Sequence, residues 1–143
     1  MRYLRRNRRP YRRPGRLGPQ PEQNPGGNMT AYALAHLHDV QSLHPDVFDY
    51  LERIQETLDP YGGRFIVHGG AVEVREGSWP GTIVIIEFPS ADQARNWYES
   101  PAYQEILPLR TDHIPGAAIL VEGVGPDHDS AEMGAMLRAA ASR

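Results

Sequence analysis

The sequence predicts an α+β domain with the element order β-α-β-β-α-β. Three observations support this class. Short runs rich in β-branched residues are typical of strands, and the clearest of them is TIVIIEF at residues 82–88. Two longer segments carry apolar residues at helical spacing. Glycine pairs and prolines separate these runs where the chain has to turn or a helix has to end.

A strand and a helix begin the domain. Residues 30–37 (TAYALAHL) predict a strand, and residues 44–59 predict a helix with a proline at its first position. The helix is indicated by apolar residues at spacings of four, three and four, namely Val47, Leu51, Ile54 and Leu58. The following pair, Gly62 and Gly63, favours the backbone conformation that ends a helix.

The second strand is predicted at residues 64–68 and is followed by Gly69 and Gly70. A glycine pair at this place allows a bend or a bulge. We therefore expect residues 72–75 to continue the same strand beyond the bend.

A helix in two pieces and a last strand complete the order. Ser90 predicts the start of the helix, because Gln93 follows at the spacing of a capping box. Pro101 interrupts this helix, and a second piece is expected to run to Arg110. Residues 116–121 predict the fourth strand.

Two right-handed crossovers in this order give a four-stranded antiparallel sheet with both helices on one face. This is the ferredoxin-like arrangement. It leaves the other face of the sheet bare, and an open apolar face needs a cover. The economical cover is a second copy, packed sheet against sheet about a two-fold axis. We therefore expect a homodimer or a higher oligomer, built as a dimeric α/β barrel.

The predicted domain spans residues 29–123, and the segments on either side differ from it in composition. Residues 1–28 hold eight arginines and one acid, a sum of +7, whereas the rest of the chain holds seven arginines and seventeen acids, a sum of −10. An acidic domain repels phosphate backbones, which argues against nucleic acid as its partner. Residues 124–143 predict a tail with a short helix, whose apolar stripe is Met133, Met136, Leu137 and Ala140.

Residues 1–28 are predicted to be a disordered leader, because they are rich in arginine, proline and glycine and hold few apolar residues. One interpretation is a basic arm for nucleic acid or an anionic membrane surface. The other is a non-native leader, since strand-like sequence follows Met29 at once. Deleting the leader is expected to leave the thermal midpoint of unfolding within about 2 °C. A larger loss in a thermal melt would mean that the arm docks on the domain.

Composition and motifs exclude several classes of function. The chain has no cysteine and no lysine, which excludes disulfides, thiol nucleophiles, thiolate metal sites, a lysine Schiff base and the P-loop lysine. No hydrolase, P-loop or zinc-protease motif occurs, so no cofactor is predicted. No apolar run approaches the roughly 20 residues of a membrane span, and no secretory signal is evident. We therefore expect a cytoplasmic protein with no membrane partner.

Four segments of the domain carry a resemblance to a known family. They are YGGRFIVHGG (61–70), EVREGSW (73–79), IIEFPSADQARNWYESPAYQEILPLR (85–110) and ILVEG (119–123). Together they resemble the domain-of-unknown-function family 1330. The resemblance implies a ferredoxin-like dimeric α/β barrel, whose wider superfamily includes small monooxygenases, haem enzymes and lactone isomerases. It implies no particular reaction, and Pro108 and the histidine-rich segment 36–45 depart from the family pattern.

Three polar residues of the predicted strands form the first candidate site. Strand alternation predicts that Arg64, His68 and Glu87 share the sheet face that lines the barrel between two subunits. In an apolar cavity, Glu87 is the candidate base, His68 the candidate proton shuttle and Arg64 an anion holder. The competing interpretation is an Arg64–Glu87 pair that only satisfies buried charge.

Arg110 and the aromatic residues before it form the second candidate site. Arg110 is a candidate anion-binding residue at the mouth of a pocket, with Trp97, Tyr98 and Tyr103 as aromatic walls. The competing interpretation is that these aromatic residues only pack in the core or in an interface.

His36 is a further candidate for ligand binding and forms an H-x-H pair with His38. Two imidazoles on one strand face, with His68 or Glu87 as a third ligand, could hold a metal. Two histidines are weak evidence, and Asp39 indicates that the strand is already ending. We therefore predict no metal site.

Three functions remain open from the sequence. The first is a dimer that binds a small molecule, with the further option of a cofactor-independent enzyme on a small polar or aromatic metabolite. The second is a binding or regulatory module without catalysis. The third is a nucleic-acid-associated protein that acts through its basic leader.

Overall fold

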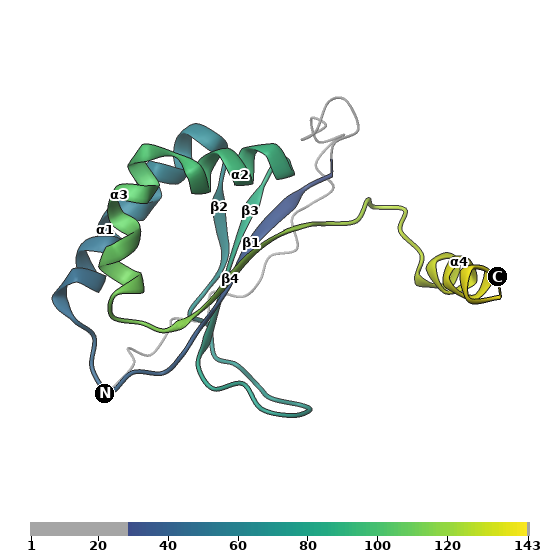
Figure 1. Ribbon diagram of the computed structural model, residues 1–143, viewed down its shortest axis with the longest axis horizontal. Coiled ribbons are helices and arrows are strands. Elements are labelled where there is room, and N and C mark those ends of the chain that lie inside the picture. The colour runs from purple at the N-terminus through teal and green to yellow at the C-terminus, as the bar shows by residue number, and fades with distance from the viewer. Residues whose placement is uncertain (1–28, 143) are drawn as a thin grey trace, which may run out of the picture.

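The structure, a computed structural model, describes residues 29–142. Its centre is an antiparallel sheet of four strands in the order β2-β3-β1-β4. The strands are β1 (Ala31–Leu37), β2 (Arg64–His68), β3 (Thr82–Phe88) and β4 (Gly116–Glu122). Helices α1, α2 and α3 lie together on one side of this sheet (Figure 1). The predicted ferredoxin-like α+β fold is therefore confirmed, whereas the predicted leader lies outside the described residues.

Helix α1 (Pro45–Leu58) forms where the apolar spacing predicts it. His44 caps its N-terminus, because its Nδ1 accepts a hydrogen bond from the backbone N–H of Asp46 at 3.1 Å. A short 3-10 turn, η1 (Asp59–Tyr61), continues the helix. The turn ends at Gly62, whose φ of 69° lies in the left-handed region that favours glycine.

Helices α2 (Ala91–Glu99) and α3 (Pro101–Thr111) meet at Ser100, as the proline predicts. The hydroxyl of Ser90 accepts from the backbone N–H of Gln93, which confirms the predicted cap of α2. The hydroxyl of Ser100 accepts from the backbone N–H of Tyr103 and starts α3 in the same way. Pro108 lies inside α3 without ending it.

The core lies between the helices and the sheet. Phe88 on β3, Leu58 on α1 and Ile106 on α3 are fully buried there. The packing is tight where the chain enters β2: a Cβ added to Gly63 would lie 2.6 Å from Cε1 of Phe88 and 2.8 Å from Cδ2 of Leu58. Only glycine fits this approach without a shift of its neighbours.

The other face of the sheet is not covered by any helix of residues 29–142 (Figure 1). We call it the open face. Leu34 on β1 and Ile85 on β3 lie opposite each other on it. Ile119 and Val121 on β4 are 53% and 45% exposed. An exposed apolar sheet face of this kind is typical of an interaction surface.

The pairing of β2 with β3 shifts by one residue in the middle of β2. Before the shift Phe65 lies opposite Ile86, and after it His68 lies opposite Val84. Ile66 is the extra residue of this β-bulge. Because paired residues of adjacent strands point to the same face, Phe65 and His68 both face the helices, although three positions separate them.

Residues 72–75 do not continue β2, so this expectation is wrong. They lie in the connection between β2 and β3, which extends beyond the sheet in Figure 1. The connection turns at Gly69 and Gly77, with φ of 72° and 71°. The β-branched residues Val72 and Val74 are exposed there and have no neighbouring strand to pair with.

Beyond β4, helix α4 (Ser130–Ala141) lies apart from the other helices at the end of an extended segment (Figure 1). None of its residues is buried. The apolar residues Met133, Met136 and Leu137 are 50%, 72% and 61% exposed. Within residues 29–142, no helix combines the length and the apolar character that a membrane crossing requires.

Candidate functional site

A cavity of about 290 Å³ lies between the helix layer and the sheet. Its walls come from α1, α2, α3 and all four strands, and they are mostly aliphatic and aromatic. Within residues 29–142, the lining includes one arginine, Arg110, and one histidine, His68, and it includes no acidic residue. The cavity is therefore an apolar space with one permanent cation.

Arg110 lies in the last turn of α3 and is only 8% exposed. Its guanidinium carbon lies 5.5 Å from the centre of the Tyr50 ring, a cation–π contact. Burial acts to lower the pKa of Arg110, but interactions with Tyr50 and Tyr103 outweigh it, and the pKa lies above its ordinary value. Among residues 29–142, no carboxylate forms an ion pair with this buried charge.

Two tyrosine hydroxyls lie beside the guanidinium. The hydroxyl oxygens of Tyr50 on α1 and Tyr103 on α3 are 2.8 Å apart and share a buried hydrogen bond. Burial, reinforced by Tyr50, raises the pKa of Tyr103 well above its usual range. The hydroxyl of Tyr103 therefore stays protonated at physiological pH, and it lies at the same end of the cavity as Arg110.

Trp97 forms a fixed aromatic wall. Its ring centre lies 4.0 Å from that of Tyr103. Its Nε1 donates to the hydroxyl oxygen of Thr57 at 3.0 Å, and that hydroxyl donates to the carbonyl of Ile54 at 2.7 Å. This chain of hydrogen bonds holds the indole in one orientation. Tyr98 lies beside it and also lines the cavity.

His68 lies at the exposed edge of the cavity. Its ring stacks on Phe65 with centres 4.1 Å apart and an interplanar angle of 5°. This contact depends on the bulge, because residues three apart in a regular strand point to opposite faces. Partial burial lowers the pKa of His68, so its imidazole is neutral at neutral pH.

The titration of His68 tests this environment. Its pKa is expected below the ordinary value of about 6.5, because desolvation disfavours the imidazolium. Folding stability then falls as the pH drops below about 6.5, since the unfolded chain takes up the proton first. Phe65→Ala should move the midpoint back toward about 6.5, measured from the imidazole resonances in an NMR titration. An unchanged midpoint in this variant would contradict the role of the Phe65 ring.

The prediction that Arg64, His68 and Glu87 share one face is wrong for His68. Arg64 and Glu87 do meet on the open face, where Arg64 Nη2 donates to Glu87 Oε1 at 3.0 Å. His68 faces the helices instead, because of the bulge. The Arg64 side chain is 67% exposed, so in a single chain the pair contributes little to stability.

His36 also lies outside the cavity lining. It faces the open side of β1, where its Nε2 donates to the carbonyl of Pro80 at 3.1 Å and its ring packs beside Trp79. The rings of His36 and His38 lie 4.9 Å apart, but no third metal ligand joins them among the described residues. The second candidate site, by contrast, is brought together: Arg110, Trp97, Tyr98 and Tyr103 all line the cavity.

Tyr50 and Phe65 are cavity residues that the sequence reasoning missed. Tyr50 lies three residues after Val47 and four before Ile54, so its place on the apolar stripe of α1 could have revealed it. Regular strand alternation would put Phe65 on the face opposite His68, and only the pairing of β2 with β3 shows that the two share a face.

The fold and the cavity define a small ferredoxin-like α+β domain with a space of about 290 Å³ between its helices and its sheet. Residues 30–124 match the family described as Domain of unknown function (DUF1330), and the chain belongs to this family. No curated protein matches the chain in sequence.

Two solved structures share the fold. A protein of unknown function from Rhodopseudomonas palustris is 16% identical, with a TM-score of 0.53 over 69% of this chain and 85% of that one. A putative antibiotic biosynthesis monooxygenase from Nitrosomonas europaea is 12% identical, with a TM-score of 0.50 over 71% and 96%. At these identities the likeness establishes the fold alone.

Proposed function

We propose that the chain is a homodimeric small-molecule-binding protein whose cavity takes a small aromatic anion. The observation that carries this proposal is Arg110, a buried cation without an acidic partner among residues 29–142. A buried charge is costly unless it is paired. An anionic group on the ligand supplies that pair, and a guanidinium binds carboxylates through two parallel hydrogen bonds.

The other walls of the cavity support the same ligand class. Trp97 and Tyr103 offer ring faces on which an aromatic ligand stacks. One of the two hydroxyls of Tyr50 and Tyr103 donates to the other, and the remaining O–H of the pair is available to donate to an anionic oxygen beside Arg110. The volume of about 290 Å³ lies at the lower end of the range for ligand pockets, which indicates a ligand of one or two rings.

The option of a cofactor-independent enzyme depends on His68. Its neutral imidazole at the cavity edge is suited to take a proton from a ligand whose anion is stabilised by Arg110. Glu87, the other candidate base, lies on the opposite face of the sheet in a pair with Arg64. We therefore propose His68 as the proton-accepting group. If the protein converts a bound ligand to a product, it is an enzyme; if the ligand stays unchanged, it is a binding module.

A titration with 1-naphthoate tests the ligand class. Trp79→Phe leaves Trp97 as the single tryptophan, so its fluorescence reports on the cavity. We expect saturable quenching by 1-naphthoate and at least tenfold weaker quenching by the neutral 1-naphthamide, because only the carboxylate pairs with Arg110. Equal affinity for the two compounds, or no saturable change with either, would overturn the proposal.

The open face is expected to be the dimer interface. Light scattering should give the mass of at least two chains at tens of micromolar. Ile85→Glu places a charge on the central strand of that face and should yield monomers, because an unpaired charge in an interface is strongly unfavourable. Phe48→Glu is the control: Phe48 is 48% exposed on α1, and this variant should remain a dimer. A monomeric parent chain would contradict the expectation.

A further inference from the structure

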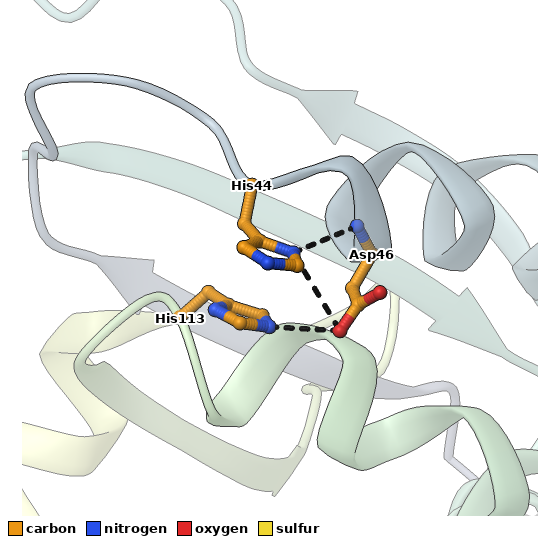
Figure 2. Close-up of side chains that lie close together, drawn as sticks. All are labelled: His44, Asp46 and His113. Atoms are coloured by element: carbon orange, nitrogen blue, oxygen red, sulfur yellow. Dashed lines mark hydrogen bonds and ion pairs between the residues drawn. The ribbon is translucent and has the colours of Figure 1, made fainter.

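Three side chains converge at the beginning of α1, outside the cavity lining (Figure 2). His44 precedes the helix, Asp46 lies in its first turn, and His113 comes from the turn between α3 and β4. One nitrogen or oxygen atom of each lies within 4.8 Å of the others. We call this group the His-Asp-His cluster.

One carboxylate oxygen is common to both histidines. Oδ2 of Asp46 lies 2.9 Å from Nε2 of His113 and 3.6 Å from Nδ1 of His44 (Figure 2). The two imidazole rings stack with centres 3.7 Å apart and an interplanar angle of 5°. Two imidazoles thus face a single acidic group, which can balance the charge of only one protonated histidine.

We propose that the His-Asp-His cluster binds a late first-row divalent metal ion, with Zn²⁺ as its representative. Two imidazoles and one carboxylate are a donor set that suits zinc, nickel, copper and cobalt. Ion-to-ligand bonds of about 2.0–2.2 Å place the ligand atoms of a tetrahedral site roughly 3.3–3.6 Å apart. The distances from Asp46 Oδ2 to the two imidazole nitrogens, 2.9 and 3.6 Å, bracket this range.

Binding requires one defined rearrangement. The two rings are parallel in this structure, so at least one must rotate for both lone pairs to point at one ion. His44 is the ring free to do so, because it lies in the loop before α1 and its side chain is 50% exposed. Asp46 and His113 are 41% and 24% exposed, so solvent can supply the remaining ligands.

The same nitrogen of His44 has a competing role. Nδ1 accepts the hydrogen bond from the backbone N–H of Asp46 that caps α1, so the metal replaces this cap with a bond to the ion. A purely structural cluster would keep the cap in the presence of metal. The backbone amide resonance of Asp46 therefore reports which of the two roles Nδ1 takes.

The metal would join segments that are far apart in sequence. His44 and Asp46 belong to the start of α1, and His113 follows α3, so the ion ties the two helices that form one wall of the cavity. Val47 and Ile114, the neighbours of Asp46 and His113, line the cavity itself. This inference does not depend on the proposed ligand, because no residue of the cluster is a lining residue.

Calorimetric titration of the full chain with ZnCl₂ tests the proposal. We expect one site per chain, and at least tenfold weaker binding for His113→Ala and for Asp46→Asn. The second variant keeps a hydrogen-bonding partner for His113 but removes the anionic ligand. Zn²⁺ should also shift the backbone amide resonance of Asp46 in the parent chain. The absence of a site, or unchanged affinity in both variants, would overturn the proposal.

The chain offers a matched control in its other histidine pair. The double variant His36→Ala/His38→Ala removes two imidazoles 4.9 Å apart on the opposite side of the sheet and should leave zinc affinity unchanged. A loss of affinity in this double variant would place the ion at β1 instead and contradict the proposal. A thermal melt of each variant without metal identifies any that fails to fold, and in that case His44→Gln replaces it.

Discussion

Replacing Arg110 by methionine is expected to weaken binding of 1-naphthoate by at least about tenfold. Hydrogen bonds to a charged group contribute about 1.5–3 kcal/mol, and each 1.4 kcal/mol is a factor of ten in affinity. Among residues 29–142, Arg110 is the only arginine that lines the cavity, so no second guanidinium can take its place.

The same substitution should leave the free energy of unfolding unchanged or raise it slightly. Replacing a buried ion by an apolar side chain is often neutral or stabilising, because the desolvation cost disappears. The cation–π contact with Tyr50, worth about 0.5–2 kcal/mol, offsets part of this gain. Binding and stability therefore change independently, which a purely structural arginine would not produce.

The measurement combines the fluorescence titration with thermal melts. Arg53→Met is the matched control, because Arg53 lies on α1 with its side chain 49% exposed and pairs with Glu105. That variant should bind 1-naphthoate as the parent does. If Arg110→Met destabilised the fold strongly and left the affinity unchanged, Arg110 would be a packing residue and the proposed function would fail.

Replacing Phe88 by alanine is expected to lower the free energy of unfolding by about 3–5 kcal/mol, the usual cost of a large-to-small change in a core. Phe88 is fully buried at the end of β3, and its ring centre lies 5.4 Å from that of Trp97. At about 4 °C per kcal/mol, the thermal midpoint should fall by more than about 10 °C. Phe48→Ala, at a residue 48% exposed, should change it by much less.

A double-mutant cycle identifies the contact responsible. Gly63→Ala alone should cost about 1–3 kcal/mol, since the new Cβ would lie 2.6 Å from the Phe88 ring. With Phe88→Ala already present, the added methyl group partly fills the space left by the ring, and the cost of Gly63→Ala should fall. Strictly additive costs would show that the two sites do not contact each other in solution.

The features that sequence predicted correctly are those set by local chemistry. Ser90 and Ser100 cap their helices because a hydroxyl at that place accepts a backbone N–H, whatever the rest of the chain does. The apolar stripe of α1 likewise depends only on helical spacing. Arg110 and the aromatic residues before it were found together because they lie on adjacent helices within fourteen positions of each other.

The features that sequence missed depend on pairing between distant segments. Residues 72–75 were expected to continue β2 beyond a bend at Gly69 and Gly70, but a segment forms a strand only where a neighbouring strand is available to pair with it. The bulge at Ile66 is a property of how β2 meets β3, so alternation along β2 alone placed His68 on the wrong face. The cluster of His44, Asp46 and His113 joins residues 67 positions apart, and no local spacing reveals it.

The bulge also affects how the sequence of β2 has to be compared with that of related proteins. In a regular strand, odd and even positions point to opposite faces. The extra residue Ile66 shifts this alternation by one position, so Phe65 and His68 point to the same face. Deleting Ile66 would join Phe65 directly to Val67 in an unbroken ladder, so Val67 would still lie opposite Ile85 and His68 would still face the helices opposite Val84. If β2 paired without a bulge at its present length, the imidazole of His68 would lie on the open face and the Val67 side chain would face the cavity. In a family member with one residue fewer in this strand, a histidine two positions after the phenylalanine would face the cavity as His68 does, so sequence comparison at this site has to count residues before it compares their identities.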